Sequence, residues 1–148
     1  MSGDMTVDMA AVHRFPIRVY YEDTDAAGIV YYANYLKFAE RARTEMMRAS
    51  GSNHRELAEN FDAAFAVSRC EIEYLKPALL DDLLTVETRV LDVGAAVIRL
   101  DQQVRRGEDL LARLRLRIAC VSRQGRPVRL PDAMRAALTS VRISKELV

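Results

Sequence analysis

Two carboxylates, Asp23 and Asp25, stand before a predicted helix that begins at Tyr32. Short polar side chains hydrogen-bond to their own backbone, so the Asp-Thr-Asp sequence predicts a turn. Gly28 follows and gives the main chain the freedom to let a ligand approach closely. The first N–H groups of a helix have no intrahelical acceptor and carry a partial positive charge. This stretch therefore predicts an anion-binding helix start beside a carboxylate.

This combination of groups is suited to acyl chemistry. A backbone donor can hold the oxygen that becomes negative when a carbonyl is attacked. A carboxylate can attack the carbonyl carbon itself or activate a water molecule. Most Asp residues in front of a helix are caps or turn formers, so spacing alone also leaves a purely structural role open.

The surrounding periodicities predict the elements that hold this turn. Residues 18–22 are β-branched and aromatic and indicate an edge strand. A helix with a stop at Gly51 should follow, with an apolar stripe formed by Tyr32, Tyr35, Leu36, Ala39, Ala42, Met46 and Ala49. Residues 52–61 read as a loop or a short helical turn. Period-two patterns predict strands over 66–74, 83–91, 96–105 and 110–121. Pro131 followed by Asp132 predicts the start of a short helix over 131–138.

We expect one long central helix laid across a curved antiparallel β-sheet, an α+β fold. In the strand 66–74, the predicted inward face begins at Ala66 and continues through Ser68 to Tyr74. The last strand carries a stripe of arginines at 113, 115 and 117, which we expect to pair with acids on facing strands rather than to bind a ligand. The candidate acids are Glu71, Glu73, Glu87 and Asp101.

The run YYEDTDAAGIVYYANYLKFAERARTE, residues 20–45, resembles the hot-dog fold acyl-CoA thioesterases of the 4-hydroxybenzoyl-CoA thioesterase superfamily. The similarity is greatest to the bacterial members associated with the Tol-Pal system. The resemblance implies that Asp25 is the catalytic carboxylate and that the backbone amide of Tyr32 polarises the thioester carbonyl. Asp23 is then expected to brace the turn. Many relatives have histidine at position 32 and serine at position 34, so this chain lacks a histidine base there.

The resemblance also suggests how a CoA thioester would be bound. Tyr31, Tyr32 and Tyr35 are candidates for lining the acyl pocket, although tyrosines at helical spacing are more often core residues. Gly28 is a candidate substrate-binding position because it lets a ligand approach the main chain. Arg123 and Arg126 follow the last strand, and arginine forks suit the pyrophosphate and 3′-phosphate of CoA. No metal and no cofactor is expected. The implied assembly is a homodimer or a dimer of dimers in which each active site draws on both chains.

Two other functions remain open at this stage. The same fold could serve as a binding module for acyl-CoA or acyl-carrier protein without catalysis, and the missing histidine keeps this alternative in view. A hydratase or dehydratase usually pairs an acid with a histidine, but His13 and His54 are poorly placed for that. The sequence leaves the acyl chain, and the choice between CoA and carrier-protein thioesters, undetermined.

Composition sets the remaining expectations. With 148 residues, 50% apolar and 29% charged, the chain should form a single domain over 15–148 after a loose tail over 1–14. A net charge of +1 gives no general attraction to nucleic acid, and no apolar run is long enough to predict a transmembrane segment. Cys70 and Cys120 read as reduced thiols. We expect a cytoplasmic protein, and the resemblance suggests contact with the periphery of the inner membrane.

Overall fold

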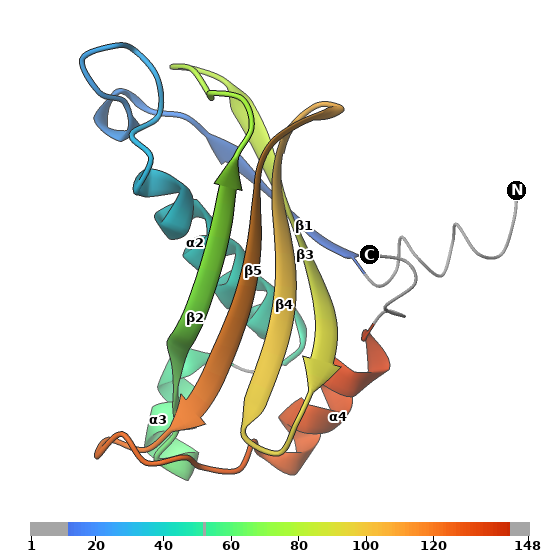
Figure 1. The fold of residues 1–148 in the computed structure, drawn as a ribbon. Helices are drawn as coiled ribbons and strands as arrows, with labels where there is room; N and C mark the ends of the chain where they lie inside the picture. The colour runs from blue at the N-terminus through green and yellow to red at the C-terminus, as the bar shows by residue number, and fades with distance from the viewer. Residues whose placement is uncertain (1–11, 52, 143–148) are drawn as a thin grey trace, which may run out of the picture.

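A five-stranded antiparallel sheet is the frame of the protein (Figure 1). The computed structural model describes residues 12–51 and 53–142. Its strands, in the spatial order β1-β3-β4-β5-β2, are β1 (Val12–Arg18), β2 (Ala64–Tyr74), β3 (Leu83–Val93), β4 (Val97–Arg106) and β5 (Asp109–Val121). The sheet is curved and α2 (Asn34–Ala49) lies along one face, which confirms the predicted α+β architecture. No helix in the described part of the chain is both long and apolar enough to cross a membrane.

The first strand lies earlier in the chain than predicted. Residues 18–22 were expected to form a strand, but β1 ends at Arg18 and a 3₁₀ helix, η1 (Tyr21–Asp23), follows. The reason is local, because the Asp23 carboxylate accepts the Tyr20 N–H at 2.8 Å and draws the chain into a turn. Residues 12–14, predicted as tail, belong to β1, and the rest of the predicted tail lies outside the described residues.

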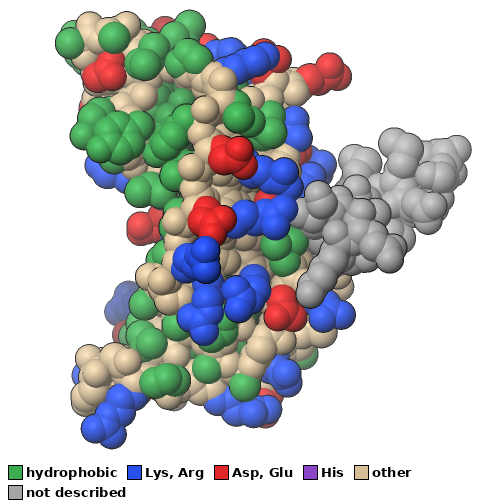
Figure 2. All heavy atoms as spheres, in the orientation of Figure 1, with side chains coloured by type: hydrophobic (Ala, Val, Ile, Leu, Met, Phe, Trp, Pro, Cys, Tyr) green, Lys and Arg blue, Asp and Glu red, His purple; other side chains and the backbone are tan. Residues whose placement is uncertain are grey.

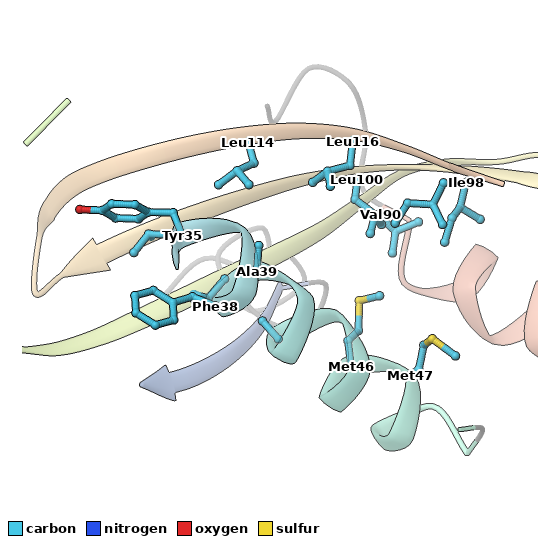
Figure 3. Close-up of a cluster of buried hydrophobic side chains, with 14 of the residues drawn as sticks. Tyr35, Phe38, Ala39, Met46, Met47, Val90, Ile98, Leu100, Leu114 and Leu116 are labelled. Carbon is cyan, nitrogen blue, oxygen red and sulfur yellow. The ribbon is translucent and has the colours of Figure 1, made fainter. Parts of the chain in front are cut away.

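Helix α2 buries one stripe against the sheet, as Figure 3 shows. Tyr35, Phe38, Ala39, Ala42, Met46 and Met47 are its buried residues. They face sheet residues that include Val90, Ile98, Leu100, Leu114 and Leu116. The predicted stripe was partly wrong, because Tyr32 precedes the helix and Leu36 and Ala49 are exposed. The helix ends where expected, with Gly51 at a φ of +95°.

A buried polar group fixes α2 on the mostly apolar sheet face. Gln102 of β4 is fully buried, and its amide donates to the Ala39 carbonyl at 3.0 Å and to the Thr88 hydroxyl at 2.9 Å. Its carbonyl oxygen accepts from Arg43 of α2 at 3.0 Å. Because leaving a buried polar group unpaired is costly, these bonds favour one position of the helix along the sheet.

Strand β2 is an edge strand with a bulge that the sequence did not indicate. The register with β5 shifts between Val67 and Arg69, so Ser68 is the extra residue. A bulge reverses the alternation of faces. Phe65 and Val67 therefore face α2 before the bulge, and even-numbered residues face it afterwards. The predicted inward face was thus wrong at Ala66 and Ser68, and β2 is largely exposed rather than half-buried.

The remaining elements largely follow the predictions. Residues 54–61 form a helix, α3 (His54–Phe61), so the helical alternative for this segment is confirmed. The C-terminal helix α4 (Asp132–Ser140) extends two residues beyond its predicted end. Of the predicted charge pairs, Asp101 accepts from Arg113 at 3.1 Å and from Arg115 at 2.7 Å. Glu71 and Glu87 form ion pairs with arginines outside the stripe, and Arg117 donates to the Ser68 hydroxyl.

Replacement of Gln102 by methionine, which has a similar shape, should show how much this polar contact stabilises the fold. It leaves the Thr88 hydroxyl and the Arg43 guanidinium without their partner, so we expect a loss of about 2 kcal/mol in the free energy of unfolding. The matched change at the exposed Gln124 should stay within about 0.5 kcal/mol. Urea unfolding measures both, and equal effects would show that the buried bonds do not stabilise the fold.

Candidate active site

The segment from Asp23 to Tyr31 folds back on itself and is called the Asp turn below. Thr24 and Val30 form an antiparallel bridge, and the Asp25 N–H donates to the Ile29 carbonyl at 2.9 Å. Gly28 closes the tip with a φ of +81° and donates to the Asp25 carbonyl at 3.0 Å. The Val30 N–H binds the Ala78 carbonyl at 2.9 Å, so the turn is anchored to the chain between β2 and β3.

The two carboxylates of the turn have different surroundings. Asp25 is exposed, and its Oδ1 accepts the Ala27 N–H at 2.9 Å. Its Oδ2 has no partner within the described residues and is available to a ligand. Asp23 instead binds its own turn through Oδ2, as described above. The bracing role expected for Asp23 is therefore confirmed, whereas a catalytic role for Asp25 stays a prediction.

The start of α2 is tied to the same turn. The Asp23 carbonyl accepts the Tyr31 N–H at 3.0 Å and the Asn34 side-chain amide at 2.8 Å. Tyr32 lies in the turn that enters the helix, two residues before the observed helix start. Among the described residues, no acceptor engages the Tyr32 N–H, while its carbonyl accepts the Tyr74 hydroxyl at 2.9 Å. A free backbone donor therefore follows the carboxylate by seven residues.

An open apolar hollow of about 340 Å³ lies beside Tyr32, and we call it the tyrosine hollow. It is lined by Ile29, Val30, Tyr32, Tyr35, Tyr74, Leu75, Lys76 and Pro77. Tyr35 is 3% exposed, so it is chiefly a core residue, and its hydroxyl accepts the Ala78 N–H at 3.1 Å. Burial raises the pKa of Tyr35, which keeps the phenol protonated. Tyr31 does not line the hollow, but its ring lies 4.9 Å from that of Tyr32.

A second hollow, of about 300 Å³, lies between α2, α3 and the first residues of β2. We call it the methionine hollow. Its lining is Glu40, Arg43, Thr44, Met46, Met47, His54, Phe65, Val67, Ile98, Leu100 and Ile118. The lining is mostly apolar, with charged groups from α2 at its side. It opens beside the bulged strand rather than beside the Asp turn.

Arg123 and Arg126 are not brought to the Asp turn within this chain. Ala64 pairs with Val121 and Tyr74 pairs with Ala112, so the loop after β5 lies at the end of β2 remote from Tyr74 (Figure 1). Ten residue steps along β2 correspond to roughly 30 Å at the usual rise of a strand. Arg123 forms an ion pair with Asp62 at 3.5 Å.

The comparison with known proteins identifies the family. Residues 19–138 match the profile of the Thioesterase-like superfamily. The chain belongs to this superfamily. It is 45% identical over 124 residues to the acyl-CoA thioesterase YbgC of Haemophilus influenzae, covering 83% of this chain and 91% of that protein. It is 42% identical over 110 residues to the acyl-CoA thioester hydrolase YbgC of Escherichia coli O6:H1, covering 73% and 81%.

Solved structures of this superfamily have the same fold. A probable thioesterase from Bartonella henselae superposes with a TM-score of 0.79 at 39% identity, covering 81% of this chain and 99% of that chain. The predicted hot-dog fold is therefore confirmed. In the described residues, no three His, Cys, Asp or Glu side chains come together in a way that could hold a metal ion.

Two residues that shape this candidate site were not predicted from the sequence. Asn34 was noted only as a departure from the family serine, yet its amide joins the helix start to Asp23. Tyr74 was assigned to a strand face, yet its hydroxyl binds the Tyr32 carbonyl across 42 positions of sequence. The polar residue at a helix start was a usable signal for Asn34. A contact between Tyr74 and Tyr32 depends on tertiary packing and has no local signal.

The backbone of Gly28, rather than the space around it, should limit substitution at the tip of the Asp turn. An added Cβ would meet no atom within 4 Å, but the φ of +81° strains other L-residues. We expect Gly28→Ala to lower the free energy of unfolding by about 1 kcal/mol and Gly28→Asn to lower it less, because asparagine tolerates positive φ. Chemical denaturation distinguishes them. Equal losses in both variants would show that φ is not the constraint.

Proposed function

We propose that this protein is an acyl-CoA thioesterase that hydrolyses a CoA thioester to a carboxylic acid and free CoA. The observation that carries the proposal is the pairing of the Asp turn with the residue that follows it: one oxygen of Asp25 and the N–H of Tyr32 are both unengaged within the described residues. The names of the relatives from Haemophilus influenzae and Escherichia coli support the same activity.

The proposed chemistry needs one carboxylate and one backbone donor. The thioester oxygen accepts the Tyr32 N–H, which stabilises the negative charge that develops on that oxygen. Asp25 can attack the carbonyl carbon and expel CoA as a thiolate, after which water hydrolyses the mixed anhydride and regenerates the carboxylate. It can instead take a proton from water, which then adds to the carbonyl carbon. Both routes release the same acid and thiol.

The tyrosine side chain at position 32 is compatible with this role. The amide belongs to the backbone and is present in every residue except proline, so the exchange of histidine for tyrosine leaves the donor in place. What the chain lacks at this position is an imidazole base. Asp25 is therefore proposed to act without a histidine, and the apolar tyrosine hollow supplies a surface for the acyl group beside the Tyr32 amide.

We also propose a homodimer formed through β2. This strand has 11 residues and lies at the sheet edge, where its outward N–H and C=O groups have no strand partner among the residues that the structure describes. Such an edge invites pairing with another strand. Exposed apolar side chains lie along or near it, including Val67 at 47%, Tyr74 at 45% and Leu75 at 52%. A second copy is the occupant that continues the sheet.

Antiparallel pairing of two β2 strands would complete the site. It reverses the partner, so the partner's Ala64 end lies against the Tyr74 end of this chain. The partner's methionine hollow and its loop after β5 would then adjoin the Asp turn of this chain. This arrangement gives the acyl group an apolar pocket and brings Arg123 and Arg126 within range of the CoA phosphates, which neither copy achieves alone.

We further propose that the protein acts in the cytoplasm and that acyl-carrier protein can present the thioester to it. Cys70 and Cys120 are both free thiols, which fits a reducing cytoplasm. Thioesters of acyl-carrier protein carry the same reacting group as acyl-CoA, so the carrier protein remains a proposed partner. A further association of two dimers and contact with the inner membrane stay predictions.

The catalytic role of Asp25 should be visible in the release of free thiol from a panel of CoA thioesters, short and long, aliphatic and aromatic. We expect Asp25→Asn to lower kcat/KM by about a hundredfold or more, within the range for catalytic groups. Asp132→Asn, at a side chain 95% exposed in α4, removes the same charge outside the site and should have no comparable effect.

Two results would contradict this proposal in different ways. Full activity in a folded Asp25→Asn variant would remove Asp25 from the mechanism. Absence of hydrolysis by the wild type across the panel, with retained binding of acyl-CoA, would favour the binding-module alternative.

Blocking the free edge of β2 should give a monomer. Leu75 donates its N–H to the Leu111 carbonyl at 2.8 Å, so antiparallel alternation turns the Cys70 N–H away from β5. Cys70→Pro removes this outward donor, and we expect a folded monomer by light scattering after size-exclusion chromatography. Cys70→Ala should remain dimeric. A monomeric wild type, or a dimeric proline variant, would contradict pairing through β2.

A further inference from the structure

Three arginines form a row across the sheet face that points away from α2. Arg69 of β2 lies opposite Arg117 of β5, and Arg117 lies opposite Arg99 of β4. Directly opposed like charges on neighbouring strands are destabilising. Figure 2 shows blue side chains gathered over this part of the sheet. We call Arg69, Arg117 and Arg99 the arginine row.

In the neighbouring rows of the sheet, carboxylates balance the positive charge of the arginines, which is not the case in the arginine row. In the adjacent row, Arg115 lies between Glu71 and Asp101, and the fully buried Asp101 accepts from it at 2.7 Å. Arg113 in the following row binds the same Asp101 oxygen at 3.1 Å. Carboxylates on this face are thus placed to balance the other arginines of β5. Arg117 itself donates to the Ser68 hydroxyl at 2.8 Å and to no carboxylate within the described residues.

The ends of the row leave positive charge uncompensated. Arg69 forms an ion pair with Glu71 at 2.6 Å, where both side chains are more than half exposed. Asp92 lies opposite Arg99 but pairs with Arg142 at 3.9 Å. Arg99 makes no ion pair with any residue that the structure describes. Within the described residues, the three guanidinium groups therefore form one ion pair, with the exposed Glu71.

The arginine row borders a hollow of about 270 Å³ on the sheet surface. Its lining is Arg69, Glu71, Leu91, Arg99, Leu100, Arg115, Leu116 and Arg117. Adjacent strands are about 4.8 Å apart, so three in-register arginines span about 10 Å. A guanidinium offers paired donors that match phosphate oxygens. The hollow and the spacing suit two linked phosphate groups.

We propose that the arginine row binds a small diphosphate-bearing anion on the face of the sheet opposite α2. The charge complementarity is direct, since such an anion would relieve the repulsion within the row. The size of the hollow suits a small molecule. A small anion is favoured over a lipid surface because it can enter the hollow that the arginines border. The proposal goes beyond the thioesterase function and does not require Asp25.

Calorimetric titration with inorganic pyrophosphate, at fixed ionic strength and without magnesium, tests this proposal directly. We expect saturable binding to the wild type, and a dissociation constant at least about tenfold larger for the double variant Arg99→Gln/Arg117→Gln, because the two substitutions remove charge-assisted hydrogen bonds to the phosphate oxygens. The control Arg48→Gln/Arg55→Gln removes the same charge from exposed helical positions and should change binding less than twofold.

Thermal unfolding provides an independent readout. Without ligand and at low salt, Arg117→Gln should match or exceed the wild-type Tm, because it relieves repulsion within the row. Pyrophosphate should then raise the Tm of the wild type more than that of this variant. A lower Tm for the unliganded variant, together with an equal gain on adding pyrophosphate, would overturn the proposal.

Vesicle binding distinguishes the source of the phosphate. Sedimentation with vesicles of phosphatidylglycerol and phosphatidylcholine should not depend on Arg99 and Arg117. Vesicle binding that is lost in the double variant while pyrophosphate binding is absent would overturn the proposal in favour of a lipid headgroup. Because these assays use no thioester, their failure leaves the thioesterase proposal standing, and normal hydrolysis by the double variant would show that the two sites are separate.

Discussion

The arrangement of the candidate active site depends on the carbonyl group of Asp23. It accepts two donors, the Tyr31 N–H and the Asn34 side-chain amide, and so joins the Asp turn to the first residue of α2. The Asp23 carboxylate closes the other side of the same turn through Tyr20. Asp23, for which no catalytic role is proposed, therefore holds the turn that positions Asp25. Asp25 is exposed, and one of its carboxylate oxygens is engaged by no described residue, because Asp23 makes the contacts that hold the turn.

This local arrangement is useful only if α2 is held at a defined place on the sheet. An apolar stripe alone would tolerate small shifts of the helix along a smooth surface. The buried Gln102 limits such shifts because its three hydrogen bonds reach both α2 and β3. The Tyr74 hydroxyl of β2 donates to the Tyr32 carbonyl, so the chain that enters α2 is also bonded to the sheet. Fold and site are thus linked through a few polar contacts in an apolar interface.

Much of the fold could be predicted from periodicity, and the errors have physical causes. Alternation placed β3, β4 and β5 within two residues of their observed ends, because these central strands bury one face along their whole length. For β2, alternation also placed the ends within two residues, but the predicted inward face was wrong, since the bulge at Ser68 reverses the faces and an edge strand needs no buried side. The strand expected at residues 18–22 was displaced by the side-chain contact of Asp23.

The site was only partly predictable for a related reason. The Asp-Thr-Asp sequence indicated a turn before a helix, and the turn was found. The contact of Tyr74 with Tyr32, and the distance of Arg123 from Asp25, depend on how distant segments pair. Strand order is a property of the whole chain and has no local signal. The proposed sharing of the site between two copies is harder still to predict, because it depends on contacts between chains.

The most direct measurement is a crystal structure of the Asp25→Asn variant bound to an acyl-CoA analogue in which a ketone replaces the thioester. The proposed mechanism predicts that the ketone oxygen lies about 3 Å from the Tyr32 nitrogen, with the side chain at position 25 beside the carbonyl carbon. A ketone bound away from Tyr32 and from position 25 would contradict it.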